Sequence, residues 1–164
     1  MFQLVKTLAS AVATAAAGKG WLFLDTTTGG PAVKDENGVT MLLAPHAIRL
    51  QVVSGAVSAG TGLHTFRMPF KFKVTAVHAT LKTAQATDGG GGIFTVDINE
   101  AGTTILSTKL TIDNTELTST TAATAAAISD DTLADDAEIT VDVDQIGDGS
   151  AEGLDVYLIG YPIG

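Results

Sequence analysis

The stretch "EITVDVDQIGDGSAEGLDVYLIG", residues 138–160, contains two runs in which apolar and polar residues alternate. Alternation with a period of two is typical of a strand that buries one face and exposes the other. A Gly-rich turn separates the runs, so they are predicted to be two strands of a sheet. Their shared parity predicts the buried set Ile139, Val141, Val143, Leu154, Val156 and Leu158.

The same stretch is rich in carboxylates: Glu138, Asp142, Asp144, Asp148, Glu152 and Asp155. Those on the two strands fall on the outward parity, while Asp148 and Glu152 lie in the turn. A catalytic carboxylate pair needs one member whose pKa is raised, usually by burial. We therefore interpret the cluster as the solvated side of a sheet. With no G-x-S-x-G elbow and no phosphate-loop Lys, we predict no catalytic residue, no cofactor and no enzyme.

The pattern of short alternating strands and Gly-rich turns extends back to Pro45. It predicts a mainly β fold, an antiparallel β-sandwich or jelly roll, over residues 46–164. Further predicted core residues are Ile48, Leu50, Phe66, Phe94, Val96 and Ile98. The run "LHTFRMPF" places His64, Phe66, Met68 and Phe70 on one face, and "IFTVDIN" places Thr95, Asp97 and Asn99 outward.

Two local features interrupt this regular pattern. In "KFKVTAVHATLKTA" the apolar parity changes between Val74 and Val77, which predicts a β-bulge near Ala76. In "EAGTTILSTKLTID" the pair Ala101-Gly102 predicts a tight turn between two strands.

Residues 1–45 are expected to form a separate anchoring or oligomerisation segment made of a short helix and a small β linker. The Ala-rich residues 2–17 lack Gly and Pro, which predicts a helix ended by Gly18 and Gly20. "WLFLD" is a strand candidate, and Asn37-Gly38 predicts a hairpin turn. The predicted oligomerisation and anchoring residues are Val5, Leu8 and Val12, which form one apolar stripe, and Trp21, the single Trp.

A helix of this length is marginal alone in water, so its formation implies sister helices or another protein surface. The first residues also resemble a weak signal peptide, although Lys6 lies inside the apolar run, where it suits such a signal poorly. The run is too short and too rich in Ala and Thr to span a bilayer. We expect no membrane partner.

Charge narrows the class of partner further. The formal net charge is −9, every Lys and Arg lies at or before Lys109, and the last 55 residues contain twelve Asp and Glu. Binding to a phosphate backbone needs clustered cations, so we expect no nucleic-acid partner. The chain has no Cys, which excludes disulfides and thiolate chemistry.

Two groups of residues are candidates for metal ligands. The acidic loop Asp130–Asp136 offers several oxygens but lacks the spacing of an EF-hand and its central Gly. His46, His64 and His78 lie in different predicted strands, although His64 and His78 could meet across neighbouring strands. We predict no metal site and leave open weak calcium binding by the acidic loop.

Three segments carry a resemblance to a known class of protein: "HTFRMP", "FTVDINE" with "GTTILSTKLTID", and "LADDAEITVDVDQIGDG" with its continuation to Gly160. Over about residues 60–160 the chain resembles the β-sandwich domain of structural proteins of tailed bacteriophages, such as fibre, spike and capsid-surface proteins. The resemblance implies a virion location and no catalytic residues. It also implies a homotrimer, because the apolar stripe of Val5, Leu8 and Val12 is too short to specify the number of chains by itself.

Three roles follow as alternatives. The first is a capsid decoration or head-fibre protein anchored by residues 1–45 on the major capsid protein or another virion protein. The second is a tail-fibre or receptor-binding component whose loops 83–92 and 145–153 contact host glycan. The third is a secreted carbohydrate-binding module. Chain length favours the first, and an aromatic content of 5% weakens both glycan interpretations.

Overall fold

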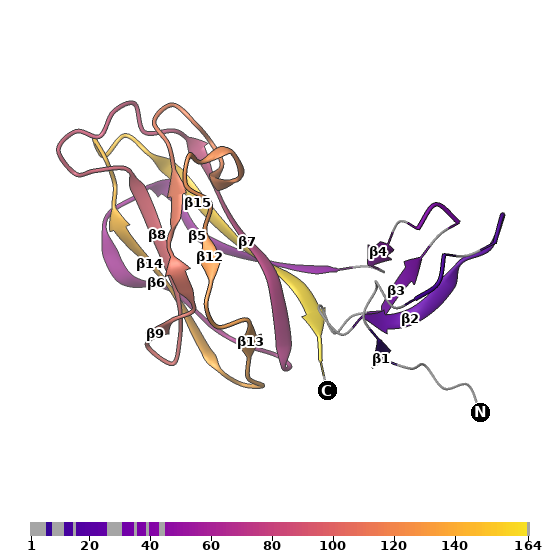
Figure 1. The fold of residues 1–164 in the computed structure, drawn as a ribbon. Helices are drawn as coiled ribbons and strands as arrows, with labels where there is room; N and C mark the ends of the chain where they lie inside the picture. The colour runs from indigo at the N-terminus through magenta and orange to yellow at the C-terminus, as the bar shows by residue number, and fades with distance from the viewer. Residues whose placement is uncertain are drawn as a thin grey trace. The chain divides into compact units, whose positions relative to one another are not determined.

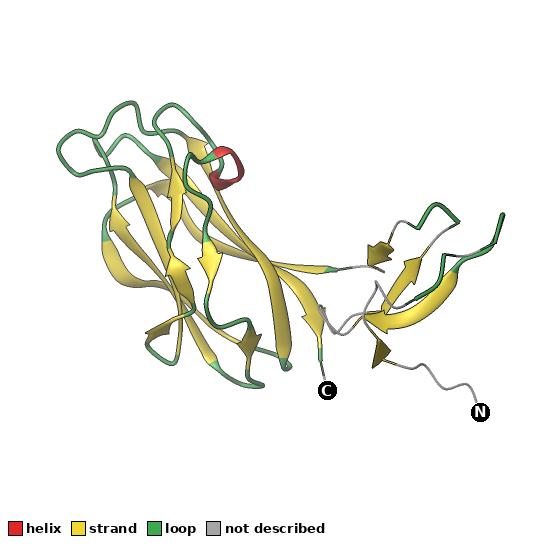
Figure 2. Cartoon of the chain, in the orientation of Figure 1, coloured by secondary structure: helices red, strands yellow, loops and turns green. Residues whose placement is uncertain are grey.

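The computed structural model describes residues 6–7, 12–14, 16–25, 31–34, 36–38, 40–42 and 45–163. The fold is mainly β, with antiparallel sheets (Figure 1). Among the described residues the helical content is one 3₁₀ turn, Ser119–Thr121 (η2) (Figure 2). The chain divides into two compact units, an amino-terminal unit of residues 1–46 and a carboxyl-terminal unit of residues 47–162.

The amino-terminal unit contains a four-stranded sheet in the order β1-β2-β3-β4. Its strands are β1 (Lys6–Thr7), β2 (Trp21–Asp25), β3 (Pro31–Lys34) and β4 (Thr40–Leu42). β3 and β4 pair antiparallel around Asn37-Gly38, and Gly38 has a φ of 79°, a conformation that glycine adopts without strain. The strand predicted for "WLFLD" and the hairpin at Asn37-Gly38 are therefore confirmed.

The helix predicted over residues 2–17 is not seen in the residues that are described there. Lys6–Thr7 form β1, which pairs in parallel with Leu24 and Asp25 of β2, and Val12 lies at a bend. Pairing with β2 gives this backbone hydrogen-bond partners, whereas a short isolated helix in water is marginal. At Lys6–Thr7 local helix propensity is thus overridden by an available sheet edge, and the rest of residues 2–11 lies outside the described residues.

The carboxyl-terminal unit is built from longer strands. Their bounds are β5 (His46–Ala56), β6 (Gly60–Arg67), β7 (Phe72–Thr83), β8 (Phe94–Glu100), β9 (Thr103–Thr104), β10 (Leu106–Thr108), β11 (Leu110–Ile112), β12 (Ala127–Ile128), β13 (Thr132–Leu133), β14 (Glu138–Gln145) and β15 (Glu152–Pro162).

These strands form two main antiparallel sheets. One has the order β11-β8-β14-β6, with β9 paired to β8, and the other has the order β13-β7-β15-β5. β10 and β12 form a separate two-stranded sheet. Because β14 and β15 are consecutive yet lie in different sheets, the Gly-rich turn between them connects one sheet to the other.

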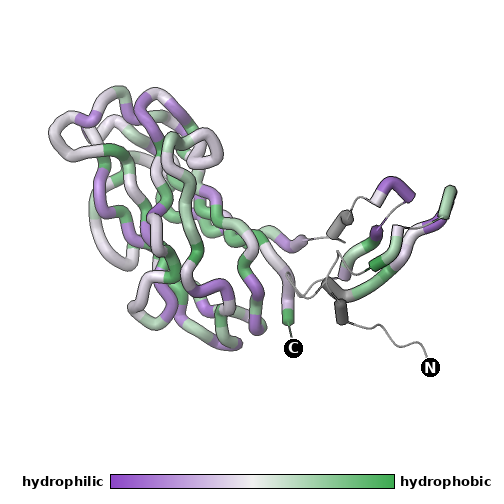
Figure 3. The backbone as a smooth tube through the Cα atoms, viewed as in Figure 1, coloured by the Kyte–Doolittle hydropathy of each residue, from purple (hydrophilic) through white to green (hydrophobic). Residues whose placement is uncertain are grey.

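Side chains of both sheets belong to a single hydrophobic core. The parity predicted for β14 and β15 is confirmed, since the six apolar residues of the opening stretch are 0–1% exposed. The strand register agrees with this parity, because buried residues pair with buried residues: Val141 pairs with Ile98 of β8, and Val156 pairs with Ala79 of β7. Figure 3 shows hydrophobic and hydrophilic residues interleaved along these strands.

The bulge predicted near Ala76 is confirmed. Ala76 pairs with Ile159 and Val74 pairs with Gly160, which leaves Thr75 as the extra residue on β7. On both sides of it the inward residues are buried, namely Val74 and Val77. The kink brings the backbone of β7 so close to β15 that a Cβ on Gly160 would lie 1.9 Å from the carbonyl oxygen of Lys73.

Several sequence predictions about burial need correction. Phe70 is 37% exposed because β6 ends at Arg67 and the chain then turns toward β7. Ile48 and Phe66 contact the core but are only half-buried, since β5 and β6 are the edge strands of their sheets. The turn predicted at Ala101-Gly102 is confirmed, since both residues have positive φ and join β8 to β9.

The outward residues of β8 and two histidines also differ from expectation. Asp97 and Asn99 have the predicted outward parity but are only 5% and 8% exposed. The segment after β8 folds back over them, and Thr104 Oγ1 donates a 2.5 Å hydrogen bond to Asp97 Oδ1.

His64 and His78 lie on β6 and β7, which belong to different sheets and are not neighbouring strands.

Candidate interaction surface

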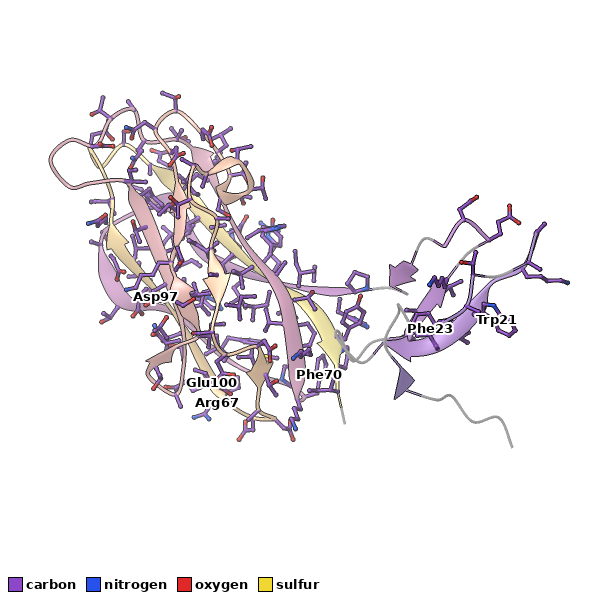
Figure 4. All side chains as sticks on the ribbon, viewed as in Figure 1. Trp21, Phe23, Arg67, Phe70, Asp97 and Glu100 are labelled. Atoms are coloured by element: carbon purple, nitrogen blue, oxygen red, sulfur yellow. The ribbon has the colours of Figure 1, made fainter. Side chains whose placement is uncertain are left out.

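The sheet of the amino-terminal unit leaves two large apolar side chains in solvent. Trp21 is 54% exposed and Leu22 is 49% exposed, and both belong to β2. Figure 4 labels Trp21 on this strand. Successive residues of a strand point to opposite faces of the sheet. Each face of this small sheet therefore presents an exposed apolar side chain.

A sheet of this size cannot cover its own apolar faces. Phe23 and Ala32, which pair across β2 and β3, are 4% and 0% exposed and form the buried part of the unit. Short sheets become stable when a further layer packs on them. We identify the exposed face residues of β2, Trp21 and Leu22, as the candidate interaction surface of the protein.

The structure describes two of the four predicted anchoring residues, Val12 and Trp21. Val5 and Leu8 lie outside the described residues. Val12 is half-buried at a bend, where its carbonyl oxygen accepts a 2.7 Å hydrogen bond from Lys34 Nζ. Trp21 is exposed on β2. Leu22 was missed, although "WLFLD" is apolar at both parities and that signal was available in the sequence.

Most carboxylates of the opening stretch have structural partners in the carboxyl-terminal unit. Lys109 Nζ lies 2.9 Å from Asp97 Oδ2 and 2.5 Å from Asp144 Oδ2, so one ammonium bridges β8 and β14. Hydrogen bonds from Lys109 to Asp144 and Asp97 raise its pKa. Asp142 accepts a 3.0 Å hydrogen bond from Asn99 Nδ2. These contacts connect β8, β14 and the segment at Lys109.

The acidic loop after β12 is likewise engaged within the chain. Lys73 Nζ lies 2.5 Å from Asp131 Oδ2, and this hydrogen bond lowers the pKa of Asp131. Asp130 Oδ1 accepts a 3.2 Å hydrogen bond from the Thr132 backbone N–H. Asp136 has a φ of 58° and lies in the turn before β14. The carboxylates of Asp130 and Asp131 thus bind groups of the protein itself.

The loops 83–92 and 145–153, proposed above as glycan contacts, are held together by Asp148. Its Oδ2 accepts hydrogen bonds of 3.1 and 2.9 Å from the backbone N–H groups of Ala86 and Thr87. Its Oδ1 accepts a 2.6 Å hydrogen bond from Ser150 Oγ. Hydrogen bonds from Ser150, and then from Thr87 and Ala86, lower the pKa of Asp148 to about 2. The loops meet so closely that a Cβ on Gly89 would lie 2.4 Å from the Asp148 Cα.

A second set of hydrogen bonds, centred on Asn114, holds loop 83–92 in place. Gln85 is fully buried, and its Nε2 donates to Asn114 Oδ1. Asn114 Nδ2 in turn donates a 2.6 Å hydrogen bond to Asp88 Oδ1. The Gly-rich tip is thus connected to its neighbours at several points.

Comparisons with family models, with curated proteins and with solved structures gave no match. Within the described residues no helix is both long and apolar enough to cross a membrane. In that part of the chain no group of three or more His, Cys, Asp or Glu side chains is placed to hold a metal ion.

Proposed function

We propose that the protein is a structural protein on the surface of a tailed-phage virion, where it acts as a capsid decoration or head-fibre protein. The observation that carries this proposal is the pair of exposed side chains on β2, Trp21 and Leu22. Exposed apolar faces on a small separate unit are typical of a surface that another protein covers. The major capsid protein or another virion protein is the partner in this proposal.

The carboxyl-terminal unit supports the same role. Its two antiparallel sheets share one core, which favours a β-sandwich of jelly-roll type. Its carboxylates serve as hydrogen-bond and ion-pair partners, an arrangement that suits a passive structural domain. A chain without Cys needs no redox chemistry to persist outside a cell.

We further propose that the protein assembles as a homotrimer through the amino-terminal unit. One face of its sheet would pack against sister units and the other against the virion, since Trp21 and Leu22 lie on opposite faces. The number three comes from the resemblance to phage surface proteins.

The second candidate is a tail-fibre or receptor-binding component, or a secreted carbohydrate-binding module. The observation that favours it is the ordered loop end organised by Asp148. Glycan sites usually stack sugar rings on exposed aromatic side chains. Loops 83–92 and 145–153 contain no Phe, Trp or Tyr, so the structural role is preferred.

The test compares two Leu substitutions at equal exposure. Leu22 of the amino-terminal unit and Leu117 of the carboxyl-terminal unit are both 49% exposed. Phage particles carrying Leu22→Ser, or Trp21→Ala, should lose most of this protein, while Leu117→Ser particles should keep full occupancy. Occupancy is measured by cryo-EM of purified particles. Full occupancy of the Leu22→Ser and Trp21→Ala proteins, or absence of the wild-type protein from particles, would contradict the proposal.

A further inference from the structure

A cavity of about 410 Å³ lies beside the bulge of β7. Residues 75–78 of β7 form one wall. Leu110 and Ile128 provide apolar surface, and Ser119 and Thr120 of η2 add hydroxyl groups. The cavity is unrelated to the candidate interaction surface, because all its lining residues belong to the carboxyl-terminal unit.

The edge of β7 is occupied at both ends of this cavity. At one end the Val74 N–H donates a 2.7 Å hydrogen bond to the Asp131 carbonyl, next to β13, which pairs only with Phe72 and Lys73. At the other end the Ala79 N–H donates a 2.9 Å hydrogen bond to Ser119 Oγ. Between these points the structure shows no strand paired with this side of β7.

The backbone of Val77 faces this gap. In an antiparallel ladder, the N–H and C=O groups of alternate residues point to the same side. Ala79 and Leu81 direct their N–H groups away from β15, to Ser119 and Leu117. Val77 has the same parity, and its side chain is buried in the core. Its N–H and C=O therefore point toward the cavity, where no other group of the described residues bonds to them.

We propose that this slot binds a short, uncharged, extended peptide segment of a partner protein, which completes the interrupted edge of the β7/β15 sheet. A peptide backbone supplies the acceptor and donor that Val77 needs, as in other cases of strand addition. An apolar side chain of the peptide would contact Leu110 and Ile128. No Lys, Arg, Asp or Glu lines the cavity, so a charged segment gains nothing there.

The length of the gap favours a short extended segment as the occupant. Residues 75–78 span about 13 Å at the usual strand rise. The edge strands of the same unit, β5 and β6, have 11 and 8 residues and are longer than this gap. The contacts at Asp131 and Ser119 bound the gap at both ends. This inference does not depend on a virion role.

The test uses ¹⁵N NMR on the full chain with the capped tripeptide acetyl-Thr-Val-Thr-amide. In the free protein the Val77 amide should exchange with solvent faster than that of His78, whose N–H faces β15. Adding peptide should shift the Val77 and Ala79 amide signals saturably and slow the exchange at Val77. The control peptide, N-methylated at Val, lacks the central donor and should cause no saturable shift.

A matched pair of variants tests the location of the site. Ala126 lines the cavity and Ala123 is exposed outside it. Ala126→Trp should abolish the peptide-induced shifts, whereas Ala123→Trp should keep them. The proposal is overturned if the Val77 amide is protected in the free protein, if Ala126→Trp leaves the shifts unchanged, or if both peptides act alike. Shifts at Val77 caused by raising the protein concentration alone would assign the slot to a second copy and also overturn it.

Discussion

The two units use the same kind of strand with opposite results for their apolar side chains. In β14 apolar residues occupy one parity, and Val141 is fully buried while Asp142 on the other parity is half-exposed. In β2 apolar residues occupy both parities, and Trp21 and Leu22 remain about half exposed. The difference shows that a strand's alternation determines how many covering layers it needs. β14 finds its single layer within the chain, whereas β2 exposes an apolar side chain on each face.

The largest expected effect comes from placing a charge in the shared core. Val141→Asp buries a carboxylate among Ile98 and other apolar side chains with no partner. We expect a loss of about 4 kcal/mol or more in the free energy of unfolding, measured by urea denaturation. The control is Thr140→Asp on the half-exposed parity of β14, for which a loss of no more than about 1 kcal/mol is expected. Equal losses in the two variants would refute the register.

A somewhat smaller effect is expected at the bulge of β7, which lies beside the cavity proposed to bind a peptide. Gly160→Ala would bring a Cβ to 1.9 Å from the Lys73 carbonyl oxygen, so the two strands must separate. We expect destabilisation of about 3 kcal/mol in urea denaturation. Gly55→Ala is the matched control, because a Cβ there meets nothing within 4 Å. Little change at Gly160 would mean that β7 and β15 do not approach in this way.

The next effect depends on pH and concerns the loop end of the carboxyl-terminal unit. The pKa of Asp148 is lowered from 3.8 to about 2, so its ionised form is favoured by folding. The stabilisation is complete well above pH 3.8 and is lost as the pH falls through 2. Asp148→Asn should melt at a lower temperature than wild type at pH 7, and the two melting temperatures should converge toward pH 2. A constant difference across that range would contradict the assignment.

The smallest effect on stability is expected in the amino-terminal unit. Trp21 is already 54% exposed, so Trp21→Ala removes little buried surface. The free energy of unfolding of the carboxyl-terminal unit should change by less than about 0.5 kcal/mol. Amide hydrogen exchange over residues 47–162, followed by mass spectrometry, measures this. Faster exchange throughout that unit would show that its stability depends on Trp21.

Much of the carboxyl-terminal unit was predictable from local patterns. Strand parity around Val141 and Val156, the bulge at Thr75 and the turn at Ala101-Gly102 all follow from period-two alternation or from a glycine, which accepts positive φ. These features depend on residues that are close together in the sequence. The candidate interaction surface was predicted in part, because Trp21 was chosen and the equally exposed Leu22 was not.

Local sequence patterns were enough to predict which residues of β14 and β15 face inward and where the turn at Ala101-Gly102 lies, because side-chain alternation and backbone sterics are local. What covers each face depends on the tertiary structure. It buries Asp97 under Thr104 and Lys109, and it places residues 6–7 beside β2 instead of in a helix. It also leaves the edge of β7 open at Val77. Such outcomes depend on contacts between distant segments, and the free energy of covering a face or pairing an edge exceeds local propensity.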